Sequence, residues 1–319
     1  MNILAQQVPE QVTRTCKETI KNNSRSFYWA SRLFPKHLGN DAVALYAWCR
    51  RADDAIDDSL PEHRPAALDR LRAEVQSVYN GTPQTDSALI AFADVVSRRQ
   101  IPMEYPLELL LGMEMDVVGT TYRTFDELLL YCHRVAGVVG LMMSHVMGVK
   151  SEKALVSAAH LGIAMQLTNI CRDVAEDWYL GRIYIPKDVL TEKDPGKDVF
   201  PQSMSSKRIG SAELARATPP SVKHLLIEAQ DFYQKGRRGL PALSWRCRWA
   251  VDAAQRIYSD IGRVLAKQGF NPMVGRAIVP GWRKFLLVTR ATASMLRFNF
   301  GRPHIPSTTL TFPDDILSR

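Results

Sequence analysis

The sequence predicts an all-α protein folded as a single-domain helical bundle. Apolar residues recur at helical spacing almost throughout the 319 residues, which is the pattern of helices with one buried face. Strand-like alternation bounded by hairpin turns is absent. Hydrophobic residues make up 46% of the chain, enough for one sizeable core. Because no linker divides the chain, residues 1–319 are expected to form one domain.

Breaks between the predicted helices fall where Pro and Gly gather. In the first half, Gly81-Thr82-Pro83 and Ile101-Pro102 are breaks, and periodicity predicts helices over 8–22, 39–58, 62–80, 86–98 and 104–118. In the second half, Asp194-Pro195-Gly196 and Pro219-Pro220 are breaks, and helices are predicted over 125–148, 151–178, 219–245, 248–268 and 276–297. The polar stretch 191–220 is predicted to be a mobile flap or loop.

Two of these helices contain segments that are apolar on nearly every side. Residues 42–49 (AVALYAWC) and 161–167 (LGIAMQL, apart from Gln166) are therefore expected in the core. The uncharged stretches 135–149 and 154–171 are the transmembrane candidates. The first is shorter than the roughly 20 residues that a spanning helix needs, and the second contains several polar side chains. Neither is predicted to span a membrane.

Positive charge gathers at the C-terminal end. The net charge is +8, and residues 201–319 hold 19 Lys and Arg against 7 Asp and Glu. This favours a diphosphate or an anionic membrane surface as partner over nucleic acid, for which no reading motif occurs. The segment 282–302 alternates basic and apolar residues. It is expected either to lie on lipid or to pack on the core as a terminal helix whose arginines reach water.

Cysteines and the N-terminus indicate the compartment. The five cysteines are scattered and lie mostly in apolar runs, which favours buried thiols in a reducing environment over disulfides. The first residues, MNILAQQVPEQ, lack the basic start and the long apolar stretch of a signal peptide. A cytoplasmic protein is expected, with the inner face of the membrane as a second expected location because of 282–302.

Two acidic clusters follow the apolar helices directly. Their members lie four apart and so share a helix face: Asp53 with Asp57, Asp54 with Asp58, and Asn169 with Asp173 and Asp177. Like charges at this spacing destabilise a helix by roughly 0.2–0.5 kcal/mol per pair when exposed, and by several kcal/mol when buried. A solvated acidic face is one interpretation. The adjoining core segments favour another, in which both stripes line the mouth of a cavity.

Oxygen ligands of this kind suit Mg²⁺, with Mn²⁺ as an alternative ion. No HExxH motif, CxxC motif or compact Cys/His cluster provides a zinc site. Two acid stripes facing each other across a pocket, with basic residues nearby, predict a diphosphate bound through magnesium.

Five motifs, in order, resemble those of the squalene and phytoene synthases, the head-to-head trans-isoprenyl diphosphate synthases. They are 24–28 (SRSFY), 46–57 (YAWCRRADDAID), 112–116 (GMEMD), 131–140 (YCHRVAGVVG), and 166–173 (QLTNICRD) with Asp177. The resemblance covers most of the chain. The wording of 112–116 and of 182–186 (RIYIP) is most similar to bacterial phytoene synthases.

The resemblance implies an isoprenoid synthase-type helical bundle around a central cavity. In it, two geranylgeranyl diphosphates would condense through prephytoene diphosphate to phytoene, with release of diphosphate, in carotenoid biosynthesis. No nicotinamide cofactor is implied. Downstream carotenoid enzymes are expected partners.

The resemblance also implies roles for individual residues. The implied metal ligands are Asp53, Asp57, Asn169, Asp173 and Asp177. The implied diphosphate donors are Ser24, Arg25, Ser26, Arg50, Arg172, Arg276 and Lys284, since bonds from Arg to phosphate oxygens are strong and directional. Ordinary helical ion pairs, Arg50 with Asp54 and Arg172 with Glu176, are an alternative that does not exclude this role.

The remaining implied residues surround the prenyl chains. Gln166 belongs to the substrate site, and Phe27, Tyr46, Tyr131 and Tyr258 would offer aromatic faces to the allylic cation. Either Tyr131 or the released diphosphate would accept the proton. Core packing with a satisfied hydroxyl is the alternative for each tyrosine. The small residues of 136–143 belong either to the core or to a wall that leaves room for a prenyl chain.

Three competing functions remain open. A squalene or dehydrosqualene synthase would perform the same ionisation on farnesyl diphosphate. A non-catalytic scaffold protein of the same fold would be expected to have lost metal-site acids, whereas both stripes are intact here. A terpene cyclase would take a single substrate, which the wording of the motifs does not favour.

Overall fold

The computed structural model describes residues 8–24, 28, 31–191 and 211–300. Every regular element in them is helical, as predicted. The helices are α1 (Glu10–Asn23), α3 (Lys36–Asp57), α4 (Arg64–Tyr79), α5 (Ser87–Arg99), α6 (Glu104–Val117), α7 (Phe125–Cys132), α8 (Val138–Val146), α9 (Glu152–Tyr179), α10 (Lys187–Thr191), α11 (Ser211–Arg237), α12 (Trp245–Lys267) and α13 (Gly281–Phe300). Short turns are η1 (Pro61–His63), η2 (His133–Gly137), η3 (Leu240–Ala242) and η4 (Pro272–Val274).

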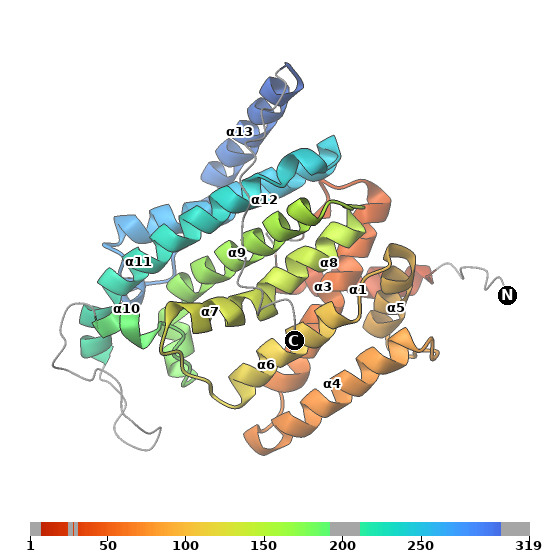
Figure 1. Ribbon diagram of the computed structural model, residues 1–319, viewed down its shortest axis with the longest axis horizontal. Coiled ribbons are helices and arrows are strands. Elements are labelled where there is room, and N and C mark those ends of the chain that lie inside the picture. Colours follow the sequence, from red (N-terminus) through yellow and green to blue (C-terminus); the bar gives the residue numbers. More distant parts are fainter. Residues whose placement is uncertain (1–7, 25–27, 29–30, 192–210, 301–319) are drawn as a thin grey trace.

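Helix α9 lies in the middle of the bundle (Figure 1). It packs against α8, α11 and α12, and against the short turn η2. Helices α1, α3, α4, α5 and α6 form the other side of the molecule, while α13 projects from the body beyond α12. The two acidic clusters end α3 and α9, so the position of these two helices decides whether the clusters meet.

Most predicted helix bounds agree with the structure within three residues, but the predicted break at Pro219-Pro220 is wrong. Helix α11 begins at Ser211 and contains both prolines. A proline inside a helix destabilises it by about 3 kcal/mol. Tertiary packing offsets this: Thr218, Ser221 and Val222 beside the prolines are buried, and the Ser221 hydroxyl donates to the Val189 carbonyl at 3.2 Å. Within the predicted flap, residues 211–220 are therefore helical, and residues 192–210 lie outside the described residues.

Three other predicted bounds differ. The expected continuous helix 125–148 contains one π-helical turn, His133–Gly137, between α7 and α8. Helix α11 ends at Arg237 rather than at 245, and α13 begins at Gly281 rather than at 276. Periodicity does not report a one-residue insertion in a helix, because the apolar pattern continues across it.

The core consists of two hydrophobic clusters. One joins α1, α3, α4, α5, α6 and α8, and at its centre the Trp48 and Phe92 rings stack at 4.2 Å. The other joins α7, α9, α11, α12 and the start of α13. Cys16, Cys132, Cys171 and Cys247 are buried, Cys49 is partly buried, and all five thiols are free, in agreement with the sequence prediction.

Two glycines let α9 approach the η2–α8 segment closely. A Cβ atom at Gly162 would lie 2.2 Å from the Ala136 carbonyl oxygen, and one at Gly140 would lie 2.4 Å from the Ala158 carbonyl oxygen. Any larger residue would push the two backbones apart. The close contact holds α9 and the η2–α8 segment side by side, and both segments contribute to the cavity wall described below.

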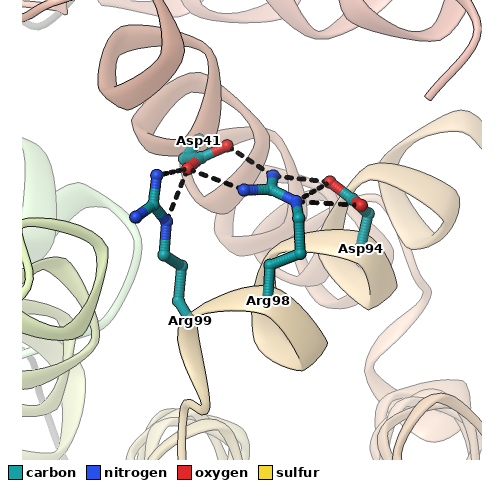
Figure 2. A network of polar contacts seen from close by, with 4 residues as sticks. All are labelled: Asp41, Asp94, Arg98 and Arg99. Carbon is teal, nitrogen blue, oxygen red and sulfur yellow. Dashed lines mark hydrogen bonds and ion pairs between the residues drawn. The ribbon is translucent and has the colours of Figure 1, made fainter. Parts of the chain in front are cut away.

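Helix α3 is tied to α5 by charge (Figure 2). The Asp41 carboxylate, whose side chain is 6% exposed, accepts hydrogen bonds from Arg98 at 2.7 Å and from Arg99 at 2.6 Å. Arg98 also binds Asp94 at 2.6 Å. The network holds the start of the helix whose other end carries the first acidic cluster.

Asp41→Asn is expected to lower the free energy of unfolding by about 2 kcal/mol, because it leaves two arginines facing a neutral group. Chemical denaturation monitored by circular dichroism measures this loss. The matched control is Asp69→Asn, which removes a surface ion pair with Arg72 and should change stability by less than about 0.5 kcal/mol. Equal denaturation midpoints for the Asp41→Asn and Asp69→Asn variants would show that Asp41 does not anchor α3 to α5.

Within the described residues, two helical segments, Phe125–Val146 and Glu152–Tyr179, are long and apolar enough to cross a membrane by length and composition. In the bundle they pack on each other, and about half of each apolar window is buried, 44% and 56%. Part of the remaining apolar surface faces the internal cavity described below. A cavity wall therefore accounts for much of their apolar composition.

The interpretation of 282–302 as a helix packed on the core is confirmed as far as residue 295. Leu287 and Ala291 are buried, and the Arg283 guanidinium binds Asp260 at 2.9 Å. The opposite side of this region is exposed, including Trp282 and Phe285.

Candidate functional site

An elongated cavity of about 360 Å³ lies between the two core clusters. Its walls come from α3, the η2–α8 segment, α9, α11, η3 and α12, and they are almost entirely apolar. On α9 the lining residues run from Ala154 to Asn169, a distance of about 22 Å at 1.5 Å per residue. The cavity can therefore take up a long, flexible hydrocarbon chain.

One part of the cavity wall is polar. Four of the predicted site residues lie in the lining: Tyr46 on α3, Gln166 and Asn169 on α9, and Tyr258 on α12. Tyr258 is also an electrostatic neighbour of Arg172 and Asp173. The polar part of the lining therefore adjoins the acidic cluster at the end of α9.

The segment 136–143 serves both as core and as cavity wall, on different faces of the same segment. Ala136, Val139, Gly140 and Met143 line the cavity. Residues 137, 138, 141 and 142 are buried against neighbouring helices. The small side chains thus form a thin wall beside the chain-shaped space.

The first acidic cluster is compensated by two arginines. Arg50 forms the expected helical ion pair with Asp54. Arg182, from the segment after α9, donates to the Asp57 carboxylate at 2.9 Å. Asp53 has a different environment: burial, together with the neighbouring carboxylates, raises its pKa to about 7.

The second cluster shows the same arrangement. Arg172 donates to Asp173 at 2.8 Å, so the alternative pairing of Arg172 with Glu176 is wrong. Glu176 instead accepts a hydrogen bond from Arg276 at 2.8 Å, and Arg276 also lies 3.2 Å from Asp173. Burial and the Asp173 charge raise the pKa of Asp177 to about 7.

The two clusters meet at Arg182. Its backbone N–H donates to the carbonyl of Asp177, near the end of α9, at 2.8 Å. Its side chain binds Asp57 at the end of α3. The Asp116 carboxylate of α6 raises the pKa of both Asp53 and Asp177 by its charge. The carboxylates of α3, α6 and α9 therefore form one electrostatic cluster.

Tyr131 lies beside this cluster rather than in the cavity lining. Its hydroxyl donates to Asp116 at 3.0 Å, and the Tyr184 hydroxyl donates to the other oxygen of Asp116 at 2.8 Å. Burial raises the pKa of Tyr131 well above its usual value, and the Asp116 charge adds to the effect. The sequence alone indicated no role for Asp116, Arg182 or Tyr184, although the first lies in the GMEMD motif and the other two in RIYIP.

The predicted metal ligands are present, but the structure does not show a preformed metal site. Among the described residues, no group of three or more His, Cys, Asp and Glu side chains is arranged to hold an ion. Arginines instead bind several carboxylates of the two clusters. The donor set nevertheless fits a cation, because the buried Asn169 Oδ1 atom has no hydrogen-bond partner and lies in a residue of the cavity wall.

Only some of the remaining predicted site residues lie in the part of the chain that the structure describes. Arg25, Ser26 and Phe27 lie outside the described residues. Ser24 ends α1, where its backbone N–H donates to the Ile20 carbonyl at 2.8 Å. Lys284 is half-buried on α13 and makes no ion pair with a carboxylate of the residues that the structure describes.

Residues 20–283 match the family model described as squalene/phytoene synthase. This range includes both acidic clusters, the cavity wall, and Tyr131 and Tyr184 beside Asp116. The chain belongs to the squalene/phytoene synthase family.

Relatives and solved structures of the family agree with this assignment. The chain is 39% identical over 262 residues to a 15-cis-phytoene synthase of Paracoccus sp. (strain N81106 / MBIC 01143), covering 80% of this chain and 82% of the relative. It is 35% identical to a phytoene synthase of Rhodobacter capsulatus, covering 90% and 83%. A dehydrosqualene synthase crystal structure in complex with a ligand matches with a TM-score of 0.78 and 29% identity, covering 91% of this chain and 98% of that one. The isoprenoid synthase-type helical fold is thereby confirmed.

Proposed function

We propose that the protein is a phytoene synthase. It joins two geranylgeranyl diphosphates head to head, through prephytoene diphosphate, and releases diphosphate in carotenoid biosynthesis. The observation that carries this proposal is the elongated apolar cavity whose polar wall adjoins two acidic clusters and their arginines. Such a site binds a long prenyl chain and a diphosphate together, and it keeps water away from an allylic cation.

Individual residues have distinct tasks in this reaction. Arg50, Arg172 and Arg276 bind diphosphate oxygens, since each lies close to a proposed metal ligand. Arg50 pairs with Asp54 and is an electrostatic neighbour of Asp53, while Arg172 and Arg276 lie beside Asp173. Tyr46 and Tyr258 offer aromatic faces to the cation within the cavity.

The family is generally dependent on divalent metal ions, and Mg²⁺ is the ion proposed here. Asp53, Asp57, Asn169, Asp173 and Asp177 would hold it. When bound, the ion would stabilise the negative charge that develops on the departing diphosphate.

The test is an incubation of the purified protein and Mg²⁺ with farnesyl or geranylgeranyl diphosphate, separately and without nicotinamide. A C40 hydrocarbon from the longer substrate is expected. A C30 product from farnesyl diphosphate alone would instead assign a dehydrosqualene-type synthase. No turnover of either substrate would revive the scaffold alternative.

Metal dependence has a second readout in protein stability. The folded pKa of about 7 for Asp53 and Asp177 lies above the unfolded value of 3.8, so their contribution to stability is present at low pH and is lost as pH rises through 7. The melting temperature of the metal-free protein should therefore fall between pH 5 and pH 8. Mg²⁺ should raise it more at pH 8, where these carboxylates are ionised.

Thermal unfolding with and without MgCl₂ at both pH values checks this prediction. Asp177→Asn should reduce both the pH dependence and the magnesium effect. A magnesium effect of equal size at pH 5 and pH 8 would contradict the placement of the ion at these carboxylates.

A cytoplasmic location with peripheral binding to the membrane surface fits the long hydrocarbon chains of the proposed substrates and product. Trp282 and Phe285 on α13 are 68% and 72% exposed, and Arg290 is exposed on the same helix. Phe285→Glu is expected to reduce co-sedimentation with anionic phospholipid vesicles several-fold. Neutral vesicles are the control, and unchanged sedimentation would remove α13 as the contact surface.

A further inference from the structure

Asp116 joins three separate parts of the chain. It lies on α6, while Tyr131 lies on α7 and Tyr184 follows α9. Each of its two carboxylate oxygens accepts one tyrosine hydroxyl, Oδ2 from Tyr131 at 3.0 Å and Oδ1 from Tyr184 at 2.8 Å. Both oxygens of an ionised carboxylate accept hydrogen bonds, so Asp116 can bind the two tyrosine hydroxyls at the same time, one at each oxygen.

The aromatic rings around this carboxylate are packed together. The Tyr131 and Tyr184 rings stack with centroids 5.0 Å apart, and the buried Tyr122 ring lies 5.6 Å from that of Tyr131. Tyr131 is 3% exposed and Tyr184 is 8% exposed. Two ring contacts and the hydrogen bond to Asp116 therefore hold the Tyr131 ring in place and direct its hydroxyl toward Asp116 and Tyr184.

This orientation has a chemical consequence. The Tyr131 proton is directed at Asp116, so the lone pairs of the phenol oxygen are directed elsewhere. A hydrogen bond to a carboxylate also increases the electron density on the phenol oxygen and ring. The Asp116 carboxylate is itself an electrostatic neighbour of Asp57 and Arg182, so the tyrosine pair is attached to the edge of the acidic cluster.

We propose that Asp116 is a positioning residue of the reaction, which acts through Tyr131 by holding its hydroxyl in one orientation, with Tyr184 as the second member of the clamp. The proposal rests on the proposed prenyl-transfer function. Asp116 itself does not contact the substrate. Its effect should therefore disappear when Tyr131 has no hydroxyl to hold.

A double-mutant cycle tests this dependence. Asp116→Asn keeps the size of the side chain but loses one acceptor, and it should lower kcat about 30-fold with KM changed less than about twofold. In a Tyr131→Phe background, Asp116→Asn should lower kcat less than about threefold further. The same non-additivity is expected with Tyr184→Phe, whose own loss should be smaller. Diphosphate release measures each rate with both farnesyl and geranylgeranyl diphosphate.

Controls separate a positioning role from a structural one. Glu114 lies on the same helix as Asp116, and Glu114→Gln, which removes its ion pair with Arg72 on α4, should leave kcat within about twofold. Circular dichroism and melting temperature report the fold of every variant. If Asp116→Asn fails to fold, Tyr184→Phe breaks the clamp from its other side, and unchanged kcat in that variant overturns the proposal.

Additive losses in the Tyr131→Phe background would also overturn it, as would a loss confined to KM. These outcomes differ from a failure of the proposed function. If the wild-type protein forms no C40 hydrocarbon but releases diphosphate from farnesyl diphosphate, the chain-length proposal fails while the cycle still decides the role of Asp116.

Discussion

Asp53→Asn and Asp173→Asn are each expected to lower kcat by at least about 1000-fold while the protein stays folded. Asp53 belongs to the cluster that ends α3, and Asp173 to the cluster on α9. Each substitution removes a carboxylate oxygen ligand from the surface that would hold the metal ion and the diphosphate. It leaves the size of the side chain almost unchanged, so packing has little reason to change.

The measurement is hydrocarbon formation and diphosphate release at saturating Mg²⁺. Asp58→Asn is the matched control, because Asp58 follows α3 directly but is exposed and has no assigned role in the site. It should retain rates within about twofold. Near-normal rates in the Asp53 and Asp173 variants would refute their assignment as ligands, and a collapse of helicity would show a structural role instead.

Ala158→Phe is expected to lower kcat/KM for geranylgeranyl diphosphate by about 100-fold. Ala158 lines the cavity on α9, eleven residues from Asn169, or about 16 Å along the helix. A phenyl ring there would occupy the space that the far half of a C20 chain needs. Farnesyl diphosphate is shorter, so its kcat/KM should fall much less and the preference should shift toward it.

Steady-state kinetics with both substrates checks this prediction. Leu155→Phe is the control: Leu155 lies on the same helix, but it is not part of the cavity lining. It should change neither preference nor rate by more than about threefold. Equal losses for the two substrates with Ala158→Phe would show that the prenyl chain does not run along α9.

Local patterns in the sequence were enough to predict much of the site. The spacing of Asp53 with Asp57 and of Asp173 with Asp177 places each pair on one helix face, because a helix repeats every 3.6 residues whatever it packs against. The apolar segments before the two clusters correctly indicated core helices. Of the residues that the family resemblance implied for the substrate site, Tyr46, Gln166 and Tyr258 lie in the cavity wall and Arg276 lies beside the second cluster.

Contacts between distant segments were the part that the sequence did not show. Arg182 and Tyr184 follow the end of α9 as ordinary loop residues, and Asp116 is one acid near the end of α6. Nothing in their local pattern indicates that Arg182 reaches Asp57 or that Asp116 accepts two tyrosine hydroxyls. Their significance arises from the way the helices pack.

The prolines of α11 illustrate the same division. Local preference correctly identifies Pro219-Pro220 as unfavourable in a helix, but burial of this segment against α9 and α10 outweighs it. By itself the sequence determined an all-α chain, two acid-bearing helix ends and a basic C-terminal region, because these follow from spacing along one helix and from composition. The tertiary structure alone decided the shape of the cavity, the arginines that occupy the carboxylates and the Asp116 clamp, because each requires groups far apart in the chain to meet at hydrogen-bond distance.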